Sequence, residues 1–320
     1  MTSVADMSIA EELKISKTHT ESVITIGVFD GVHLGQQHLI NSLKDHAKTL
    51  QCSSGVITFK NHPASIINPN FEPDFVTTLE HRISLLRNTK VDFVCPITFN
   101  NEVASLGAGD FIKLLQDHLG MKMLVVGPDF QMGKGREADV NDLYNLGSQL
   151  GFDLEVVKVE QRNGISVRST ELRKQLSQGN VETVSLMLGR PFSITGKVVE
   201  GFKRGREIGF PTANLESENG ISVPKNGIYS TIATVSGKKY MAASSIGTRP
   251  TFDNGSRTIE AFILDFNELI YGEKITLQFM NRLRDEIKYD SLEELIAQIN
   301  DDVSKTRNSL EHLMSYDSGV

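Results

Sequence analysis

The sequence has little cysteine, with only Cys52 and Cys95 among its 320 residues. They are far apart and form no CxxC or zinc-like spacing, so we interpret both as small apolar side chains rather than metal ligands or a disulfide. No apolar stretch approaches the roughly 20 residues that a membrane-spanning helix needs. The start, MTSVADMSIAEELK, has early acids and no apolar segment typical of a signal peptide. We therefore expect a cytoplasmic protein with no membrane partner.

Basic side chains are outnumbered by acidic ones. The chain has 33 Lys and Arg against 40 Asp and Glu, which gives a formal net charge of -7. An acidic protein is a poor candidate for general nucleic-acid binding, although local donors can still bind phosphates. Neither a Walker A motif nor GxGxxG occurs anywhere. We expect no nucleic-acid partner, and the composition gives no oligomeric state.

The first half alternates apolar runs with helical patterns. A chain of this length exceeds what one hydrophobic core usually organises, which predicts two domains. Alternating strands and helices predict a doubly wound parallel sheet, with ligands bound beyond the carboxyl ends of its strands. The apolar runs are 23–28, 55–59, 91–97, 121–127 and 154–159, and the helical patterns are 34–50, 79–87, 108–119 and 140–150. The helix at 34–50 should carry Leu39, Leu43, Ala47 and Leu50 on one apolar stripe.

The second half has a different pattern. From Phe192 onward, β-like runs are separated by turn signals such as SGKK and DNGS, which predicts a small antiparallel barrel or sandwich. A terminal helix follows, with Ser291 as its expected N-cap ahead of Glu294. The boundary falls near LMLGRP, so the predicted domains are 1–185 and 186–320.

The stretch TIGVFDGVHLGQQHLI holds the first candidate site. Gly27, Gly31 and Gly35 let the backbone turn tightly and approach a ligand closely. The helix that follows offers free N–H groups and a positive dipole end to a phosphate, and His33 adds a donor at its entrance. The alternative is that His33 merely caps the helix.

Three further segments end near the same edge of the predicted sheet. TFKNHP places His62 just after the second strand, and VGPDFQMGKGR places Asp129 after the fourth. ISVRSTELR places Ser169 and Thr170 at a helix start, with Arg173 in its first turn. Each could be ordinary turn chemistry, but together they form a constellation where such a sheet binds its ligand.

A second candidate site lies in GFKRGREIGFPTAN. Thr212 and Asn214 are two residues apart, so an extended chain points both side chains the same way. Hydroxyl and amide oxygens suit Mg²⁺, which keeps waters and shares phosphate oxygens. The preceding glycines and basic residues form a loop able to fold over phosphates. The alternative is a hairpin loop with solvated charges.

Glu260 is the candidate base of this second site. We expect it on the strand TIEAFILDF, on one face with Phe262, Leu264 and Phe266. A carboxylate among apolar side chains is unusual, and a position at the mouth of a substrate pocket would explain it. A salt bridge at the strand end is the alternative.

The motifs of both halves resemble one enzyme family. GVFDGVHLGQ, HP, GPDFQMG and RSTELR resemble the nucleotidyltransferase module of bacterial FAD synthetases. GRPFSITGKVVEGFKRGREIGFPTANL and RTIEAFILDF resemble the riboflavin kinase module of the same enzymes. The resemblance implies a bifunctional riboflavin kinase/FMN adenylyltransferase, with a Rossmann-like first domain and a barrel second domain. It implies riboflavin, FMN and ATP as small-molecule partners, FAD as product, and Mg²⁺ as the metal.

The resemblance also implies roles for single residues. Glu260 becomes the kinase base, Thr212 and Asn214 the metal ligands, and His33 and Gln36 the residues of adenylyl transfer. Flavin contacts are implied at His62, Asp129, Arg249 and Thr251. ATP contacts are implied at Gly27, Phe29, Asp30, Gly31, Gly35, Ser169, Thr170, Arg173, Lys203, Gly205, Arg206, Gly209 and Pro211.

The chain departs from the family pattern mainly in its first half. Gln36 stands where the HxGH pattern has its second histidine, and Asn61, Met132 and Arg168 replace an expected proline, phenylalanine and serine. The second half departs mainly at Phe202, where aspartate is common. A neutral donor at position 36 predicts adenylyl transfer slower by about ten- to thirty-fold. Two alternatives remain: a kinase whose first domain serves stability or regulation, and a non-catalytic flavin or nucleotide sensor.

Overall fold

A computed structural model describes residues 7–16, 20–158, 161–162, 165–201, 204–248 and 257–317. By its internal contacts the chain divides into two compact units, Met1–Ser169 and Thr170–Val320. Helix α9 (Val181–Leu188) contacts strands of the second unit, and Lys225 N donates to Leu176 O of helix α8 (Ser169–Gln178). The contacts therefore assign both helices to the second unit, and the limits 1–185 and 186–320 stay a prediction.

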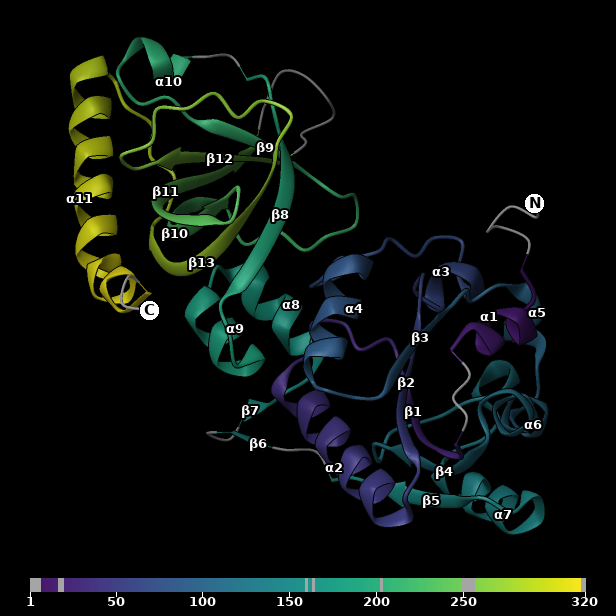
Figure 1. Cartoon of the computed structure of the whole chain (residues 1–320). Helices are drawn as coiled ribbons and strands as arrows, with labels where there is room; N and C mark the ends of the chain where they lie inside the picture. Colours follow the sequence, from purple (N-terminus) through teal and green to yellow (C-terminus); the bar gives the residue numbers. More distant parts are fainter. Residues whose placement is uncertain are drawn as a thin grey trace. The chain divides into compact units, whose positions relative to one another are not determined.

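The first unit is built on five parallel strands in the order β3-β2-β1-β4-β5 (Figure 1). Central β1 pairs in parallel with both β2 and β4. The predicted doubly wound sheet is confirmed, with strand limits within a few residues of the expected ones. The strands are β1 (Ser22–Ile26), β2 (Ser53–Phe59), β3 (Phe93–Ile97), β4 (Met121–Val126) and β5 (Asp153–Val156).

Helices cover both faces of this sheet, which is why β1 is buried throughout. Val23 packs with α2 and α4 on one face, whereas Ile24 and Ile26 pack with α1, α6 and α7 on the other. These helices are α1 (Ile9–Ile15), α2 (Leu34–Leu50), α4 (Leu79–Asn88), α6 (Ala108–Leu119) and α7 (Val140–Leu150). Shorter elements are α3 (Ala64–Ile67), α5 (Asn101–Ser105), the 3-10 turn η2 (Lys134–Arg136), β6 (Gln161–Arg162) and β7 (Ile165–Ser166).

The stripe expected on α2 is only partly correct. Ile40, Leu43 and Ala47 are its buried residues, whereas Leu50 is 44% exposed. Leu50 is the last residue of the helix, and Gln51 ends it in the left-handed conformation. The helical period continues to this residue, but the contact with the sheet does not.

The second unit is a closed barrel with strand order β10-β11-β12-β9-β8-β13, so the open choice between barrel and sandwich is settled. Phe192, Tyr229 and Phe279 fill its interior, and the ring of Phe279 lies 5.8 and 5.4 Å from the other two. Helix α11 (Leu292–Asp317) runs along the barrel (Figure 1). The other elements are β8 (Phe192–Val199), α10 (Arg204–Glu207), β9 (Ala213–Ser217), β10 (Gly227–Val235), β11 (Lys238–Thr248), β12 (Arg257–Ile263) and β13 (Lys274–Arg284).

Two local expectations have different outcomes. The N-cap of α11 is confirmed, because Glu294 N donates to Ser291 Oγ at 3.2 Å. The face expected for Glu260 is wrong in part, because β12 ends at Ile263 and therefore excludes Leu264 and Phe266. Within the strand the fully buried residues are Ile259, Ala261 and Ile263, and Glu260 alternates with them on the opposite, half-buried face with Phe262.

Candidate functional site

The loop between β1 and α2 has an unusual backbone. Phe29, Gly31 and Val32 have positive φ angles of 52°, 86° and 43°. Glycine adopts this conformation freely, but phenylalanine and valine are strained there. Both side chains are nevertheless buried, at 3% and 2% exposure. Such strain persists only where surrounding contacts fix the loop.

Asp30 provides those contacts. Its carboxylate is 2% exposed and accepts hydrogen bonds from Val76 N at 2.9 and 3.0 Å and from Thr77 N at 3.1 Å. Gly31 N in turn donates to Thr77 Oγ1 at 3.1 Å. The geometry gives Asp30 a loop-holding role, and the ATP contacts implied at Phe29, Asp30 and Gly31 stay predictions.

His33 is the N-cap of α2. Its Nδ1 accepts from Gln36 N at 3.2 Å, and its backbone N–H donates to Gln36 Oε1 at 3.1 Å, which forms a reciprocal capping box. In this cap Nδ1 is the acceptor, so Nε2 is the ring nitrogen left to donate. The amide of Gln36 uses its oxygen in the cap and keeps its NH₂ group for another acceptor. The capping role left open by the sequence is therefore present.

A cavity of about 300 Å³ opens beside this cap. We call it the Gln36 cavity. It brings together five residues implied in the first site, namely His33, Gly35, Gln36, Asp129 and Ser169. A side chain at Gly35 would place its Cβ 3.0 Å from Val167 O, so the segment before Ser169 packs directly on the first turn of α2.

Three residues that line the Gln36 cavity, Asp129, Arg168 and Ser169, form polar contacts that fix its wall. Arg168 Nη2 lies 2.8 Å from Asp129 Oδ2, and these side chains are 57% and 68% exposed. Ser169 Oγ donates to Asp30 O at 2.9 Å and so ties this wall to the β1–α2 loop. Thr170 and Arg173 belong to the second unit, and their implied contacts with ATP stay predictions.

An apolar cavity of about 280 Å³ adjoins the Gln36 cavity, and Phe130 lines both. We call it the Phe130 cavity. Gly27 and Met132 line it, together with the aromatic residues Phe59, Phe99 and Phe111. His62 is not among its lining residues. Its ring stacks on Phe71 at 4.6 Å, and its flavin contact stays a prediction.

Asn61 has a structural explanation. Its Nδ2 donates to Phe99 O at 2.8 Å, and its Oδ1 accepts from Phe99 N at 2.9 Å. These bonds join the chain leaving β2 to the chain leaving β3, so this departure from the family pattern stabilises the edge of the sheet beside the Phe130 cavity.

The second site lies on paired strands. Glu260 on β12 pairs in register with Asn214 on β9, and Thr212 Oγ1 donates to Glu260 Oε2 at 3.2 Å. A Cβ at Gly201 would lie 2.3 Å from Asn214 Nδ2, so only glycine leaves room for that amide. The predicted base and both predicted metal ligands are therefore neighbours.

Two cavities meet at Thr212. The Glu260 cavity, of about 310 Å³, contains Gly205 and Glu260 in its wall. The Tyr271 cavity, of about 200 Å³, is lined by Tyr271 and by two residues implied in ATP binding, Arg206 and Pro211. Gly209 lines neither of these two cavities, as the described residues define them.

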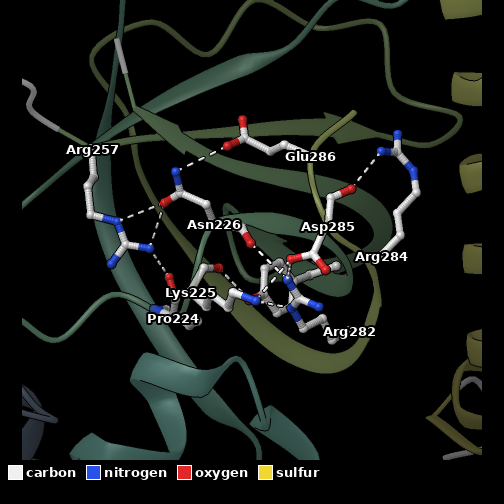
Figure 2. Close-up of polar contacts among 9 residues, drawn as sticks. Pro224, Lys225, Asn226, Arg257, Arg282, Arg284, Asp285 and Glu286 are labelled. Carbon is white, nitrogen blue, oxygen red and sulfur yellow. Dashed lines mark hydrogen bonds and ion pairs between the residues drawn. The ribbon is translucent and has the colours of Figure 1, made fainter. Parts of the chain in front are cut away.

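Three implied contacts, Lys203, Arg249 and Thr251, lie outside the described residues, as does Phe202. The end of β11 and the start of β12 are both hydrogen-bonded to the side-chain amide of Asn226. Asn226 Nδ2 donates to Thr248 Oγ1 at 2.8 Å and to Glu286 Oε2 at 3.1 Å, and its Oδ1 accepts from Arg257 Nε at 3.2 Å. Figure 2 shows Asn226 between Arg257 and Glu286.

An ion pair that the sequence did not reveal lines the Glu260 cavity. Arg284 on β13 binds Asp302 on α11 through two nitrogens, with Nη2–Oδ2 at 2.6 Å and Nε–Oδ1 at 2.9 Å. Burial acts to lower the pKa of Arg284, but the Asp302 carboxylate outweighs it and holds that pKa above its usual value. Asp302 is 3% exposed. The pair fixes α11 against the barrel and so fixes the width of the cavity.

The metal prediction fits the groups present. In the part of the chain that the structure describes, no three His, Cys, Asp or Glu side chains are placed to hold a metal ion. Thr212 and Asn214 instead offer a hydroxyl and an amide oxygen beside one carboxylate. Such a sparse set suits Mg²⁺, which takes its remaining ligands from phosphate and water.

No helix among the described residues is long and apolar enough to cross a membrane.

Comparison with known proteins agrees with this two-site geometry. The FAD synthetase family model matches residues 15–171, and the riboflavin kinase family model matches residues 188–310. A protein of Escherichia coli (strain K12) named bifunctional riboflavin kinase/FMN adenylyltransferase is 36% identical over 279 residues, which cover 87% of this chain and 89% of its own. One of that name from Bacillus subtilis is 35% identical, with 90% and 92% covered. The chain belongs to the bifunctional riboflavin kinase/FMN adenylyltransferase family.

A solved structure shares the whole fold. A Streptococcus pneumoniae protein named macrolide-efflux protein matches with a TM-score of 0.85 and 31% identity, covering 92% of this chain and 97% of its own. The likeness therefore extends over both units.

Some residues of the two sites could not be identified from sequence motifs. They are either apolar or bound to partners that lie far away in the sequence. Phe130 stands inside the motif GPDFQMG, but nothing in the sequence shows that it separates two cavities. Arg284 and Asp302 lie on different elements, and no local spacing links them. In the sequence Arg168 stands out only as a departure from the family pattern, whereas the structure places it in the wall of the Gln36 cavity.

Proposed function

We propose that the second unit phosphorylates riboflavin to FMN with ATP. The observation that carries this proposal is Thr212, which lies in the wall of two cavities and is hydrogen-bonded to Glu260. In this reaction Glu260 accepts the proton of the terminal ribityl hydroxyl. The hydroxyl oxygen forms a bond to the γ-phosphorus as the bond to the β-phosphate oxygen breaks and ADP leaves.

The two cavities suit the two substrates. The Glu260 cavity holds the base, and Phe210, Phe262, Leu295 and Ile299 give it apolar walls for an isoalloxazine ring. Arg206 lines the Tyr271 cavity and offers a cation to the ATP phosphates.

The metal would lie at Thr212, the residue that lines both cavities. Thr212 and Asn214 would hold Mg²⁺ together with phosphate oxygens, and the ion would neutralise charge on the transferred group. Gly201 keeps the amide of Asn214 in place. The chain's own contribution is therefore to hold the nucleotide on one side of Thr212 and the flavin hydroxyl on the other.

We propose that the first unit adenylylates FMN to FAD. An FMN phosphate oxygen attacks the α-phosphorus of ATP, and the bond to the β-phosphate oxygen breaks to release pyrophosphate. The Phe130 cavity supplies apolar walls for the flavin ring, and the adjoining Gln36 cavity supplies the helix N-terminus and the NH₂ group of Gln36 for the phosphates. Catalysis here is positioning and charge stabilisation, because no covalent enzyme intermediate is needed.

A time course with riboflavin, ATP and Mg²⁺, with flavins separated by chromatography, tests both proposals. We expect FMN to appear first and FAD to follow. Accumulation of FMN without FAD, also when FMN is supplied, supports the kinase-only alternative. Flavin binding without any ATP turnover supports the sensor. A cytoplasmic location stays a prediction.

A further inference from the structure

The cationic groups of the Gln36 cavity are few. The Nδ1 of His33 accepts from the backbone of α2, and the side chain of Gln36 carries no charge. The remaining charged side chains of the lining are Lys158, Arg168 and Asp129. Among the described residues of its lining, a nucleotide that brings several phosphate charges into this cavity therefore meets the basic side chains of Lys158 and Arg168, and Arg168 is paired with a carboxylate.

We propose that Arg168 is a catalytic residue of adenylyl transfer, whose guanidinium contacts the ATP phosphates and supplies the positive charge that Gln36 lacks. The inference rests on the proposed FMN adenylyltransferase function of the first unit. It connects two departures from the family pattern. Gln36 replaces a residue that can carry a positive charge, Arg168 adds a positive charge, and both side chains line the same cavity.

The backbone around Arg168 is fixed where this role needs it. The preceding residue, Val167, places its carbonyl oxygen against Gly35 in the first turn of α2. The following residue, Ser169, is hydrogen-bonded to Asp30 O of the loop before α2. Arg168 is thus held between two contacts to the segment that carries Gln36. Lys158 follows the end of β5, is exposed, and has no comparable anchor among the described contacts.

The ion pair with Asp129 does not prevent this role. Both side chains are more than half exposed, and a surface pair of this kind contributes about 0–1 kcal/mol. Arg168 can therefore exchange a carboxylate for a phosphate at little cost, and its planar fork binds two phosphate oxygens at once. No proton moves to or from it, because arginine stays protonated throughout the reaction. Its donors stabilise the charge on the α-phosphate and on the departing pyrophosphate.

Arg168→Ser gives the first test. We expect the kcat for FAD formation from FMN and ATP to fall by about ten- to thirty-fold, since a charge-assisted contact is lost. The rate of FMN formation and the melting temperature should not change. Lys122→Ser is the matched control: Lys122 is 52% exposed and pairs with Glu21 at 3.0 Å, so the variant also removes one cation from an exposed ion pair of the first unit. This control should keep the full FAD-forming rate.

A double-mutant comparison makes the test specific. Gln36→His should raise FAD formation less than about three-fold in the natural chain, but about ten-fold or more in the Arg168→Ser background. The natural chain should keep a nearly flat FAD-forming rate between pH 6 and 8, because arginine stays charged. The double variant should become faster toward pH 6, because a histidine introduced at position 36 gains its charge near pH ~6.5. The other titratable side chains that line the cavity are Lys158, Asp129 and the capping His33.

Three results overturn the inference: an unchanged or raised FAD-forming rate in Arg168→Ser, a ten-fold loss in Lys158→Ser but not in Arg168→Ser, or equal gains from Gln36→His in both backgrounds. Failure of the proposed function would be recognised separately, because the natural chain would then form no FAD.

In that case the inference can still be tested by measuring the binding of α,β-methylene-ATP by calorimetry. The Asn214→Ala background is used so that binding at the second nucleotide site is weakened. Arg168→Ser should weaken the remaining site by at least about ten-fold, and unchanged binding there also overturns the inference.

Discussion

Glu260 and Asn214 face each other on neighbouring strands of the barrel, whereas the Gln36 cavity is lined by four described chain segments, three of which follow strands of an open sheet. On the barrel side, strand register positions both polar groups directly. On the sheet side, Asp30 and Ser169 hold loops through hydrogen bonds to other loops, and His33 caps the helix that follows its loop. A site on paired strands tolerates little change in its few reacting residues. A site on loops can move a charge from one segment to another and keep its chemistry.

The strongest test of this contrast is Glu260→Gln. The variant keeps shape and loses the proton acceptor, so FMN formation should fall by at least about 10²-fold, while FAD formation from supplied FMN is unchanged. Glu216→Gln, an exposed carboxylate on β9, is the matched control and should be silent. A near-full kinase rate in Glu260→Gln would remove Glu260 from its assigned role.

Glu12→Gln should act on the sheet unit alone. The Glu12 carboxylate is 4% exposed and accepts from Lys60 Nζ at 2.7 Å and from Thr98 N at 2.6 Å. Burial acts to raise the pKa of Glu12, but the hydrogen bonds from Lys60 and Thr98 outweigh it and leave that pKa below its usual value. We expect the variant to lose about 2 kcal/mol of stability at neutral pH.

The pH dependence of the Glu12 effect has a definite sign. A carboxyl whose pKa is lowered by folding stabilises the protein above its unfolded pKa, and this stabilisation disappears as the pH falls through the folded value. The difference in unfolding free energy between the natural chain and Glu12→Gln should therefore be constant from pH 8 to about 5 and shrink on further acidification. Denaturant titrations followed by FAD-forming activity measure it. A difference that grows on acidification contradicts the pairing.

Asn214→Ala should raise the KM for MgATP in FMN formation by about ten-fold, with little change in melting temperature. Gly201→Ala provides the independent check, because its Cβ would displace the same amide without removing it. Gly237→Ala controls for the loss of a glycine in the same unit: its added Cβ would meet nothing within 4 Å, and its positive φ of 80° should cost stability but leave the KM for MgATP unchanged. If Asn214→Ala unfolds and its folded fraction keeps normal ATP affinity, the residue is structural.

The smallest effect is expected for Asn61→Ala. Losing the two bonds to Phe99 should lower stability by about 1 kcal/mol and leave the FAD-forming rate of the folded enzyme unchanged. Thermal unfolding and a rate per folded molecule measure these quantities. A slower folded enzyme would instead mean that this departure affects the site itself.

Much of this architecture could be predicted because its signals are local. Alternating apolar runs and helical periods indicated the parallel sheet, and PTAN with a glutamate on a later strand indicated the second site. The end of β12 was predicted too late, since the apolar pattern continues through Leu264 and Phe266 after the pairing stops. The contacts of Arg168 with Asp129 and of Arg284 with Asp302 could not be predicted, because each joins residues that only the folded chain brings together.

The Asp30 contacts have a consequence for isotope exchange. Val76 and Thr77 lie outside regular secondary structure, where amide protons usually exchange with solvent quickly, yet both N–H groups are bonded to one buried carboxylate. Their amides should therefore exchange as slowly as those of a strand. Because the same carboxylate belongs to the loop before α2, any ligand that shifts this loop should change the exchange rate at these two positions. The exchange rates of the Val76 and Thr77 amides, which are far in sequence from the β1–α2 loop, should therefore report whether a ligand is bound in the first unit.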